Sequence, residues 1–387
     1  MLSFLLPIIY LSFVSLGLPD SLLGSAWPSI HAQLGVPMSY AGIISMIISL
    51  CTVISALTTA RVTARFGTGR VTAVSVVMTA AALLGFSLSN SFWQLCLLAI
   101  PYGLGAGCVD AALNNYVALH YASRHMSWLH CMWGLGTTIG PLIMGAALSG
   151  GRGWNIGYRY VGIVQLIISV VIFASLPLWK KAADESGGEV KTKALPLREA
   201  VKIPGAKEVM LSFFCYCSYE QVAILWGSSY LTVAAGMSPE RAASLASLFC
   251  IGITVGRGLS GFITYKLNDT QMIRLGQTIV ALGSVLMLLP FGAWNRMAGL
   301  LIVGLGCAPV YPCIIHSTPQ NFGAENSQAI IGIQMASAYV GITLMPPLFG
   351  LIAQHITVKL MPVFILLLLT IGALMYESLV KKAQKKI

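Results

Sequence analysis

Residues 93–119 read WQLCLLAIPYGLGAGCVDAALNNYVAL, a run of 27 residues that contains a single charged side chain, Asp110. A helix of this length rises about 40 Å at 1.5 Å per residue, whereas the hydrocarbon core of a bilayer is about 30 Å thick. A long run with almost no charge is typical of a transmembrane helix. We therefore expect this segment to cross a membrane and to carry Asp110 into it.

The rest of the chain repeats this pattern. Of its 387 residues, 57% are hydrophobic and only 9% are charged, which is too few to cover the surface of a soluble protein. The apolar runs predict an all-α membrane protein with twelve transmembrane helices. We expect these helices at residues 4–30 (retained, not cleaved as a signal peptide), 38–60, 70–90, 93–119, 127–149, 157–178, 207–233, 240–265, 271–290, 296–316, 327–355 and 359–379.

The basic residues indicate the orientation of these helices. The net charge of +11 could suggest a nucleic-acid partner, but the 23 Lys and Arg residues are concentrated in a few connecting loops and the C-terminal tail. In a twelve-helix chain 17 of them fall on one side and five on the other, with Arg257 inside a helix. By the positive-inside rule, we expect a multi-pass protein of a cell inner membrane with both termini in the cytoplasm, and no nucleic-acid partner.

The chain also resembles itself at an offset of about 200 residues. Gly103-Leu-Gly105 precedes Asp110 much as Gly304-Leu-Gly306 precedes Tyr311. Residues 180–206 form a long charged segment between the two halves, as a linker would. We expect two pseudo-symmetric six-helix bundles, at residues 1–179 and 207–387, joined by a cytoplasmic linker at 180–206.

Three acidic residues, Asp20, Asp110 and Glu220, lie deep within predicted helices. An ionised carboxylate in the bilayer costs at least ~2.5 kcal/mol, so each must face a polar cavity, have a partner or hold a proton. A carboxyl that exchanges its proton as water enters and leaves is what proton coupling requires. The alternatives are that Asp110 only locks helix packing through Asn114, four residues later, and that Asp20 only reaches water at the outer face.

Other polar and aromatic side chains could complete a site for a sugar. Amides and carboxylates bind hydroxyl groups, and an indole ring offers a flat apolar surface to the C–H face of a pyranose. Each candidate has a structural alternative, such as packing within a helix bundle or, for Trp226, a place at the membrane interface. The candidate substrate-binding residues are Asp20, Asn114, His130, Trp133, Glu220, Gln221, Trp226, Tyr311 and Gln334, and the candidate proton-coupling residues are Asp110 and Asp20.

Several motifs resemble those of a known transporter superfamily. The loop at 60–70, ARVTARFGTGR, is similar to the G-x-x-x-D-R-x-G-R signature of the major facilitator superfamily, with Ala64 in place of the acidic residue. The segment at 105–114, GAGCVDAALN, resembles the fourth-helix pattern of the fucose:proton symporter family. The stretches 129–141, 219–226 and 306–312 are similar to the same family. In that family's first helix the acidic residue aligns near Gly24, one turn after Asp20.

The resemblance implies the major facilitator fold and a secondary transporter that binds a monosaccharide in a cavity between two bundles. It implies import coupled to protons, with Asp110 at the coupling position, or alternatively to sodium. A multidrug or metabolite exporter and a non-transporting nutrient sensor stay open as well. We expect a monomer in the lipid bilayer without a cofactor or metal, and no enzyme, because no His/Asp metal spacing or Ser-His pair lies at helix depth.

Overall fold

The computed structural model describes residues 2–20, 22–36, 40–185, 195, 197–237 and 239–384, and all regular structure in these ranges is helical. Most of the predicted linker, residues 186–194 and Pro196, lies outside them. Contacts within the chain define two compact units. Unit 1 contains Met1–Tyr116, Leu129–Leu195 and Ala324–Gly332, and unit 2 contains Val117–Trp128, Pro196–Gly323 and Ile333–Ile387.

These units follow the two halves of the sequence, with one exchange in each direction. The short segment Val117–Trp128 groups with unit 2, although the residues before and after it belong to unit 1. The segment Ala324–Gly332 groups with unit 1, although its helix continues in unit 2. The domain boundaries expected at residues 179 and 207 stay a prediction.

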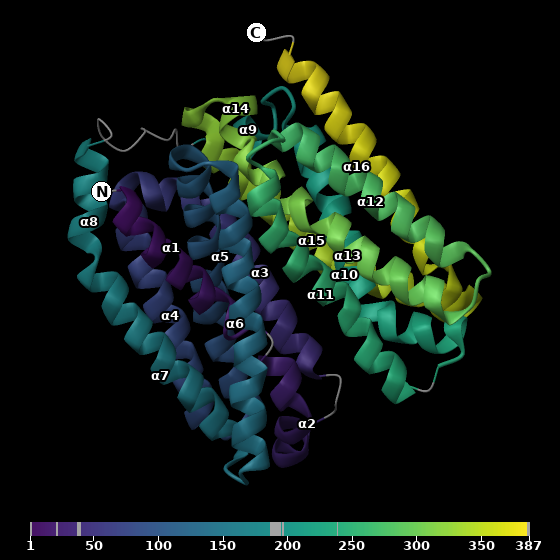
Figure 1. The fold of residues 1–387 in the computed structure, drawn as a ribbon. Coiled ribbons are helices and arrows are strands. Elements are labelled where there is room, and N and C mark those ends of the chain that lie inside the picture. Colours follow the sequence, from purple (N-terminus) through teal and green to yellow (C-terminus); the bar gives the residue numbers. More distant parts are fainter. Residues whose placement is uncertain are drawn as a thin grey trace. The chain divides into compact units, whose positions relative to one another are not determined.

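Unit 1 is a bundle of long helices (Figure 1). The helices of the first half are α1 (Leu2–Gly17), α2 (Leu22–Leu34), α3 (Ala41–Phe66), α4 (Thr68–Leu88), α5 (Phe92–His120), α6 (Ser123–Ser149), α7 (Gly153–Ala174) and α8 (Leu176–Glu185).

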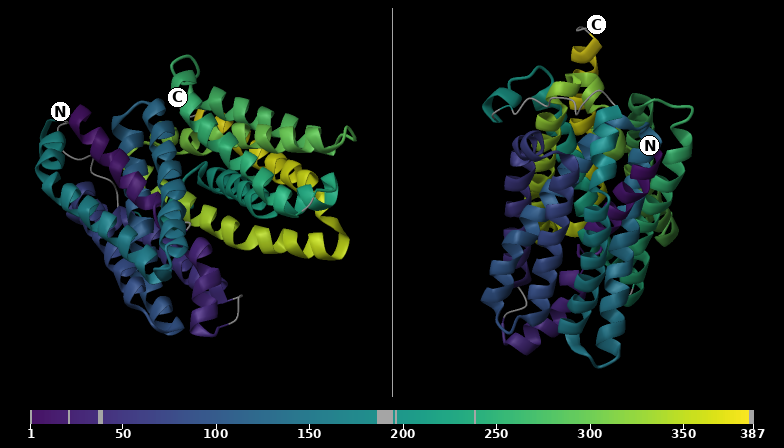
Figure 2. Two further views of the ribbon diagram at one scale, coloured as in Figure 1. Left: turned by 60° about the horizontal axis from the view of Figure 1, so that its bottom comes forward. Right: turned by 90° about the vertical axis from the view of Figure 1, so that its left-hand side faces the viewer.

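Unit 2 is a second bundle of the same kind, and two further views show its long helices from other sides (Figure 2). The helices of the second half are α9 (Leu197–Ala200), α10 (Ala206–Ala235), α11 (Pro239–Ile263), α12 (Asp269–Leu288), α13 (Ala293–His316), α14 (Thr318–Phe322), α15 (Ala324–Ile352) and α16 (Met361–Gln384). A π-helical turn, Ala353–Thr357, and a 3-10 turn, Val358–Leu360, connect α15 to α16.

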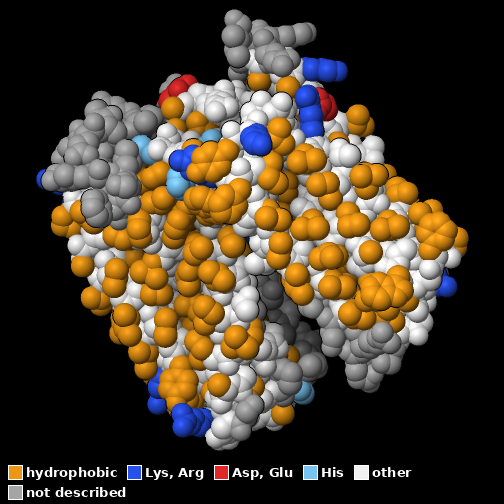
Figure 3. Space-filling model, viewed as in Figure 1, with side chains coloured by type: hydrophobic (Ala, Val, Ile, Leu, Met, Phe, Trp, Pro, Cys, Tyr) orange, Lys and Arg blue, Asp and Glu red, His pale blue; other side chains and the backbone are white. Residues whose placement is uncertain are grey.

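The long helices are apolar enough to cross a membrane. Ten such stretches occur among the described residues, and the longest, Ala324–Ala383, contains both α15 and α16. Helix α11 adds a shorter apolar stretch, Leu248–Ile263. Hydrophobic side chains cover the flanks of the helices, whereas Lys and Arg lie toward their ends (Figure 3). The prediction of an all-α, twelve-helix membrane fold is confirmed.

Glycines let the central helix of each half approach its neighbours closely. A Cβ atom at Gly103 of α5 would collide with the backbone carbonyl of Ile48 in α3, and one at Gly304 of α13 would collide with the carbonyl of Phe249 in α11. Contacts of this kind between backbones are what small residues permit in membrane bundles. The repeated Gly-Leu-Gly motif therefore has the same packing role in both halves.

The single first helix expected over residues 4–30 is wrong in one respect, because α1 ends at Gly17 and α2 begins at Leu22. Pro19 has no backbone N–H, so the carbonyl of Ser15, four residues earlier, loses its helical partner. The side chain of Gln165 in α7 donates a hydrogen bond to this carbonyl instead. The break matters for function because Asp20 lies within it.

Candidate functional site

Asp20 is held at the helix break by two donors from other helices of unit 1. The indole Nε1 of Trp133 in α6 donates to Asp20 Oδ2 at 2.7 Å, and the hydroxyl of Tyr102 in α5 donates to Oδ1 at 3.1 Å. Asp20 is an exposed residue and lines a cavity of about 120 Å³, with Tyr102 and Tyr158 in its walls. Asp20 and Trp133 are therefore brought together, and Asp20 reaches water.

Asp110 begins a second chain of polar contacts, which runs through Asn114 to His130. The Asn114 amide donates from Nδ2 to Asp110 Oδ1 at 2.8 Å, and its Oδ1 lies 3.0 Å from His130 Nε2. An amide oxygen can only accept, so His130 Nε2 carries the hydrogen. All three side chains are buried. The structure thus gathers Asp110, Asn114 and His130 into one directed chain of hydrogen bonds.

These two carboxyls accept hydrogen bonds from uncharged side chains. In the described part of the chain, no ion pair includes Asp20 or Asp110. Their environment in unit 1 therefore offers hydrogen bonds from neutral groups but no compensating charge.

Glu220 in unit 2 is in a different environment. Its Oε1 lies 3.4 Å from Arg257 Nη2, and Arg257 on α11 is only 4% exposed. Tyr216, one helical turn before Glu220 on α10, donates its hydroxyl to the carbonyl of Cys307 at 3.0 Å. Its ring lies 6.1 Å from that of Tyr311. The acidic residue of unit 2 is thus in an ion pair with aromatic neighbours, unlike the two carboxyls of unit 1.

Three of the remaining candidates in unit 2, Trp226, Tyr311 and Gln334, make hydrogen bonds within the unit. Trp226 donates its indole N–H to the carbonyl of Pro346 at 3.0 Å, and its ring packs against Phe349. Tyr311 donates to Met335 Sδ at 3.2 Å. Gln334 is fully buried and bonds through its amide to Thr318, as shown by an Nε2 to Oγ1 distance of 3.2 Å. Gln221 is half-buried. A role of these residues in binding a substrate stays a prediction.

Reasoning from the sequence missed two residues that complete these clusters. In the sequence, Tyr102 is one of many aromatic residues in apolar helices, and nothing in a single sequence shows that it faces Asp20. Arg257 carried a usable signal, because an arginine within a membrane helix needs a partner, and Glu220 was an available acid in the same half of the chain.

A larger cavity lies elsewhere in unit 1. It has a volume of about 610 Å³ and runs along α3 and α4, between Ser55 and Phe66 on one side and Arg70 and Met78 on the other. Its lining is mostly apolar, and the hydroxyls of Ser55 and Thr58 already donate to backbone carbonyls. It does not contain the carboxyls, and we do not place a polar solute there.

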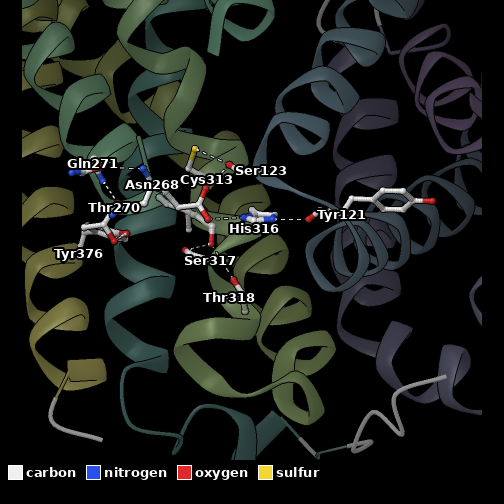
Figure 4. Close-up of polar contacts among 12 residues, drawn as sticks. Tyr121, Ser123, Asn268, Thr270, Gln271, Cys313, His316, Ser317, Thr318 and Tyr376 are labelled. Atoms are coloured by element: carbon white, nitrogen blue, oxygen red, sulfur yellow. Dashed lines mark hydrogen bonds and ion pairs between the residues drawn. The ribbon is translucent and has the colours of Figure 1, made fainter. Parts of the chain in front are cut away.

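A further polar cluster lies where α12 begins and α13 ends (Figure 4). His316, the last residue of α13, has its Nδ1 2.6 Å from Asp269 Oδ2 and its Nε2 2.9 Å from the backbone carbonyl of Tyr121. Ser123 donates its hydroxyl to the other oxygen of Asp269. Nothing in the sequence drew attention to this cluster, because Asp269 and His316 are 47 residues apart at helix ends.

Comparison with known proteins agrees with this architecture. The sequence matches the profile of the Major Facilitator Superfamily over residues 9–327 and 209–386, which together include almost the whole chain. The chain belongs to the major facilitator superfamily. It is therefore a transporter and not an enzyme, and the resemblance predicted from its sequence motifs is confirmed.

Two relatives illustrate how far the sequences have diverged. A yeast (Saccharomyces cerevisiae) relative, Bypass of stop codon protein 6, is 22% identical over 95% of this chain and 81% of its own length. The glucose/mannose transporter GlcP of Bacillus subtilis is 19% identical, over 62% of this chain and 60% of GlcP.

Among solved structures, FucP in its outward conformation matches with a TM-score of 0.76 and 12% identity. The match covers 96% of this chain and 98% of FucP. FucP is a fucose:proton symporter of Escherichia coli. At this identity the likeness shows the shared fold.

Proposed function

We propose that this protein is a secondary active transporter that couples the uptake of a monosaccharide to protons by alternating access. It would lie in the inner membrane with both termini in the cytoplasm, as the distribution of basic residues predicts. Asp110 would carry the coupling proton, and Asp20, Trp133 and Glu220 would bind sugar hydroxyls.

The observation that carries this proposal is the contrast between carboxyls with and without a cation. A carboxylate within the membrane needs a partner charge, a polar cavity or a proton. Glu220 has Arg257, and Asp20 lines a cavity, whereas Asp110 is buried with an amide as its donor. Of the three, Asp110 is therefore the one that most needs a proton when water is excluded, and it would release that proton when water enters.

The polar groups around Asp20 support a sugar as the solute. Its carboxylate can accept from sugar hydroxyls, the Tyr102 hydroxyl can donate or accept, and the Trp133 indole provides an apolar face next to them. Small-molecule sites commonly measure about 300–1,000 Å³, so the cavity of about 120 Å³ in unit 1 forms only part of such a site. The relatives GlcP and FucP, which by their names transport glucose or mannose and fucose, support the same class of solute.

Purified protein in liposomes tests this function directly. A monosaccharide added outside sealed, weakly buffered liposomes should be taken up together with protons, so the external pH should rise. Glucose, mannose, fucose, galactose and xylose would each be added, and the pH would be followed with an impermeant dye. A proton ionophore should abolish the accumulation of labelled sugar.

Three outcomes would contradict the proposal in different ways. Accumulation that follows a sodium gradient, without a change in pH, would replace the proton by sodium. Transport of apolar drugs but of no sugar would identify an exporter. Sugar binding without any transport would indicate a nutrient sensor.

A further inference from the structure

His316 is surrounded so that both of its ring nitrogens face acceptors. Nδ1 lies 2.6 Å from a carboxylate oxygen of Asp269, and Nε2 lies 2.9 Å from the backbone carbonyl of Tyr121. A carbonyl oxygen can only accept, so Nε2 must carry a hydrogen. The short contact at Nδ1 needs a second hydrogen, either on the imidazole or on the carboxyl.

A count of hydrogens shows that the paired side chains hold one more proton than the same side chains hold when apart. With both contacts made, His316 and Asp269 together carry two hydrogens, whichever of the two groups has the second one. Apart and in water above about pH 6.5, a histidine is neutral with one hydrogen and an aspartate has none. The contacts in the structure therefore require one proton more than the separated side chains would carry.

Among the described residues, the groups in contact with the pair are uncharged side chains, which cannot replace this proton. Its neighbours are the Ser123 hydroxyl on Asp269, the thiol of Cys313 on α13 and, from α16, the phenol of Tyr376, which bonds to Thr270. The side chains of His316 and Asp269 are only 11% and 6% exposed. Figure 4 shows Ser123 and Cys313 above His316 and Thr270 and Tyr376 to its left, with the ring of Tyr121 pointing away.

The pair connects a loop to the ends of two helices. Tyr121 lies in the connection between α5 and α6, and Ser123 is the first residue of α6; both are within the segment Val117–Trp128 that groups with unit 2. Asp269 is the first residue of α12, where Asn268 and Gln271 form a capping box that fixes the start of the helix. The hydrogen bonds of the pair thus dock residues 121–123, called the α5–α6 loop below, onto the ends of α12 and α13.

We propose that His316 and Asp269 form a proton-binding site, separate from Asp110, whose proton holds the α5–α6 loop against α12 and α13. When the loop leaves, the carbonyl of Tyr121 and the hydroxyl of Ser123 leave with it, the pair becomes exposed to water and its extra proton dissociates. The proposal rests on the alternating-access part of the proposed function, but it requires neither the sugar nor Asp110.

The sign of the pH dependence follows from the proton count. The docked state binds one proton more than the released state, so acid favours docking. Below about pH 6.5 the separated histidine is also protonated, so docking takes up no further proton and the docked population is at its maximum. Above that value, the equilibrium constant for docking falls with rising pH by up to tenfold per pH unit, until the docked pair itself loses the proton.

Spin labels report this equilibrium in the full-length protein. We would place them at Arg61→Cys, after replacing the accessible native Cys108, Cys131 and Cys250 by Ser, and at Lys266→Cys. Asp110→Asn is included in every sample, so that the coupling site cannot contribute. Distance distributions would be recorded without sugar in lipid nanodiscs between pH 5.5 and 8.5. We expect two populations whose ratio changes by up to tenfold per pH unit above pH 6.5.

Variants assign this titration to the pair. His316→Asn should remove the pH dependence, and His316→Lys, which stays charged over this range, should keep the docked population at every pH. His355→Asn, a change at another histidine of unit 2, should leave the titration of the parent unchanged. A parent without pH dependence, or a His316→Asn protein that titrates like the parent, would overturn the proposal. Both results leave the sugar and pH-gradient experiments on Asp110 unaffected.

Discussion

Helices α5 and α13 occupy corresponding places in the two halves, and they differ in chemistry more than in packing. Gly103 and Gly105 of α5 meet backbone atoms of α3 and α4, and Gly304 and Gly306 of α13 meet those of α11 and α12. Seven residues after the first glycine, α5 carries Asp110, whereas α13 carries Tyr311. The repeat therefore preserves the close approach of helices, while the carboxyl at this position of the repeat is found only in the first half.

The same contrast extends to the helices around them. In unit 1, Asp20 and Asp110 are bonded to neutral donors, whereas in unit 2 the charge of Glu220 is balanced by Arg257. A carboxylate beside a fixed cation has little reason to change its protonation during a transport cycle. Because Glu220 has a fixed counter-charge and Asp110 has none, the proposed transport cycle places its coupling proton on Asp110 and not on Glu220.

The largest effect on stability is expected from breaking the ion pair of unit 2. Arg257→Gln leaves Glu220 without its counter-charge, and removal of one partner from a buried pair typically costs about 3–5 kcal/mol. Thermal unfolding of the purified protein, followed by tryptophan fluorescence, measures this loss. The double variant Arg257→Gln/Glu220→Gln should recover most of it. If the single variant unfolds like the parent, the pair does not compensate charge.

The shared packing predicts a matched loss in the two halves. Gly103→Ala and Gly304→Ala each place a methyl group against a backbone carbonyl that cannot move aside, and overpacking of this kind costs about 1–3 kcal/mol. Gly258→Ala on α11 is the control, because its Cβ would meet no atom within 4 Å. The same unfolding assay compares the three variants. A loss in only one half would show that the packing is not equivalent.

The smallest effect is expected at Trp226. Its indole N–H bonds to the carbonyl of Pro346, and its ring packs on Phe349, so these contacts favour a packing role over sugar stacking. Trp226→Phe should lower stability by about 0.5–1.5 kcal/mol, the net contribution of one hydrogen bond, and leave sugar affinity unchanged. Titration calorimetry with the transported sugar gives the affinity. A large loss of sugar affinity with normal stability would contradict the packing role and indicate that Trp226 contacts the sugar.

Most of the fold could be predicted from the sequence, because the bilayer imposes one simple rule. Helix length and the absence of charge identified the spans, and the helices expected at 70–90 and 296–316 correspond closely to α4 and α13. The break at Pro19 was missed, because its cost is offset by a side chain far along the chain, that of Gln165 in α7. Such a long-range partner has no signature in a single sequence.

The candidate site could be predicted only in part. The spacing of Asp110 and Asn114 on one helical face indicated their hydrogen bond, because residues four apart are neighbours on a helix. The contacts of Asp20 with Trp133 and Tyr102 join three helices and depend on how these helices pack. The same is true of His316 and Asp269, whose pairing is set by the meeting of two helix ends.

The central claim is that the proton of the transport cycle resides on Asp110 and not on the compensated carboxyl of unit 2. Asp110→Asn mimics a permanently protonated side chain at almost constant volume. In liposomes this variant should still exchange labelled for unlabelled sugar but should no longer accumulate sugar in response to a pH gradient, and Asp20→Asn, tested beside it, should retain more accumulation. Accumulation by Asp110→Asn at the level of the parent, driven by the same pH gradient, would contradict the account.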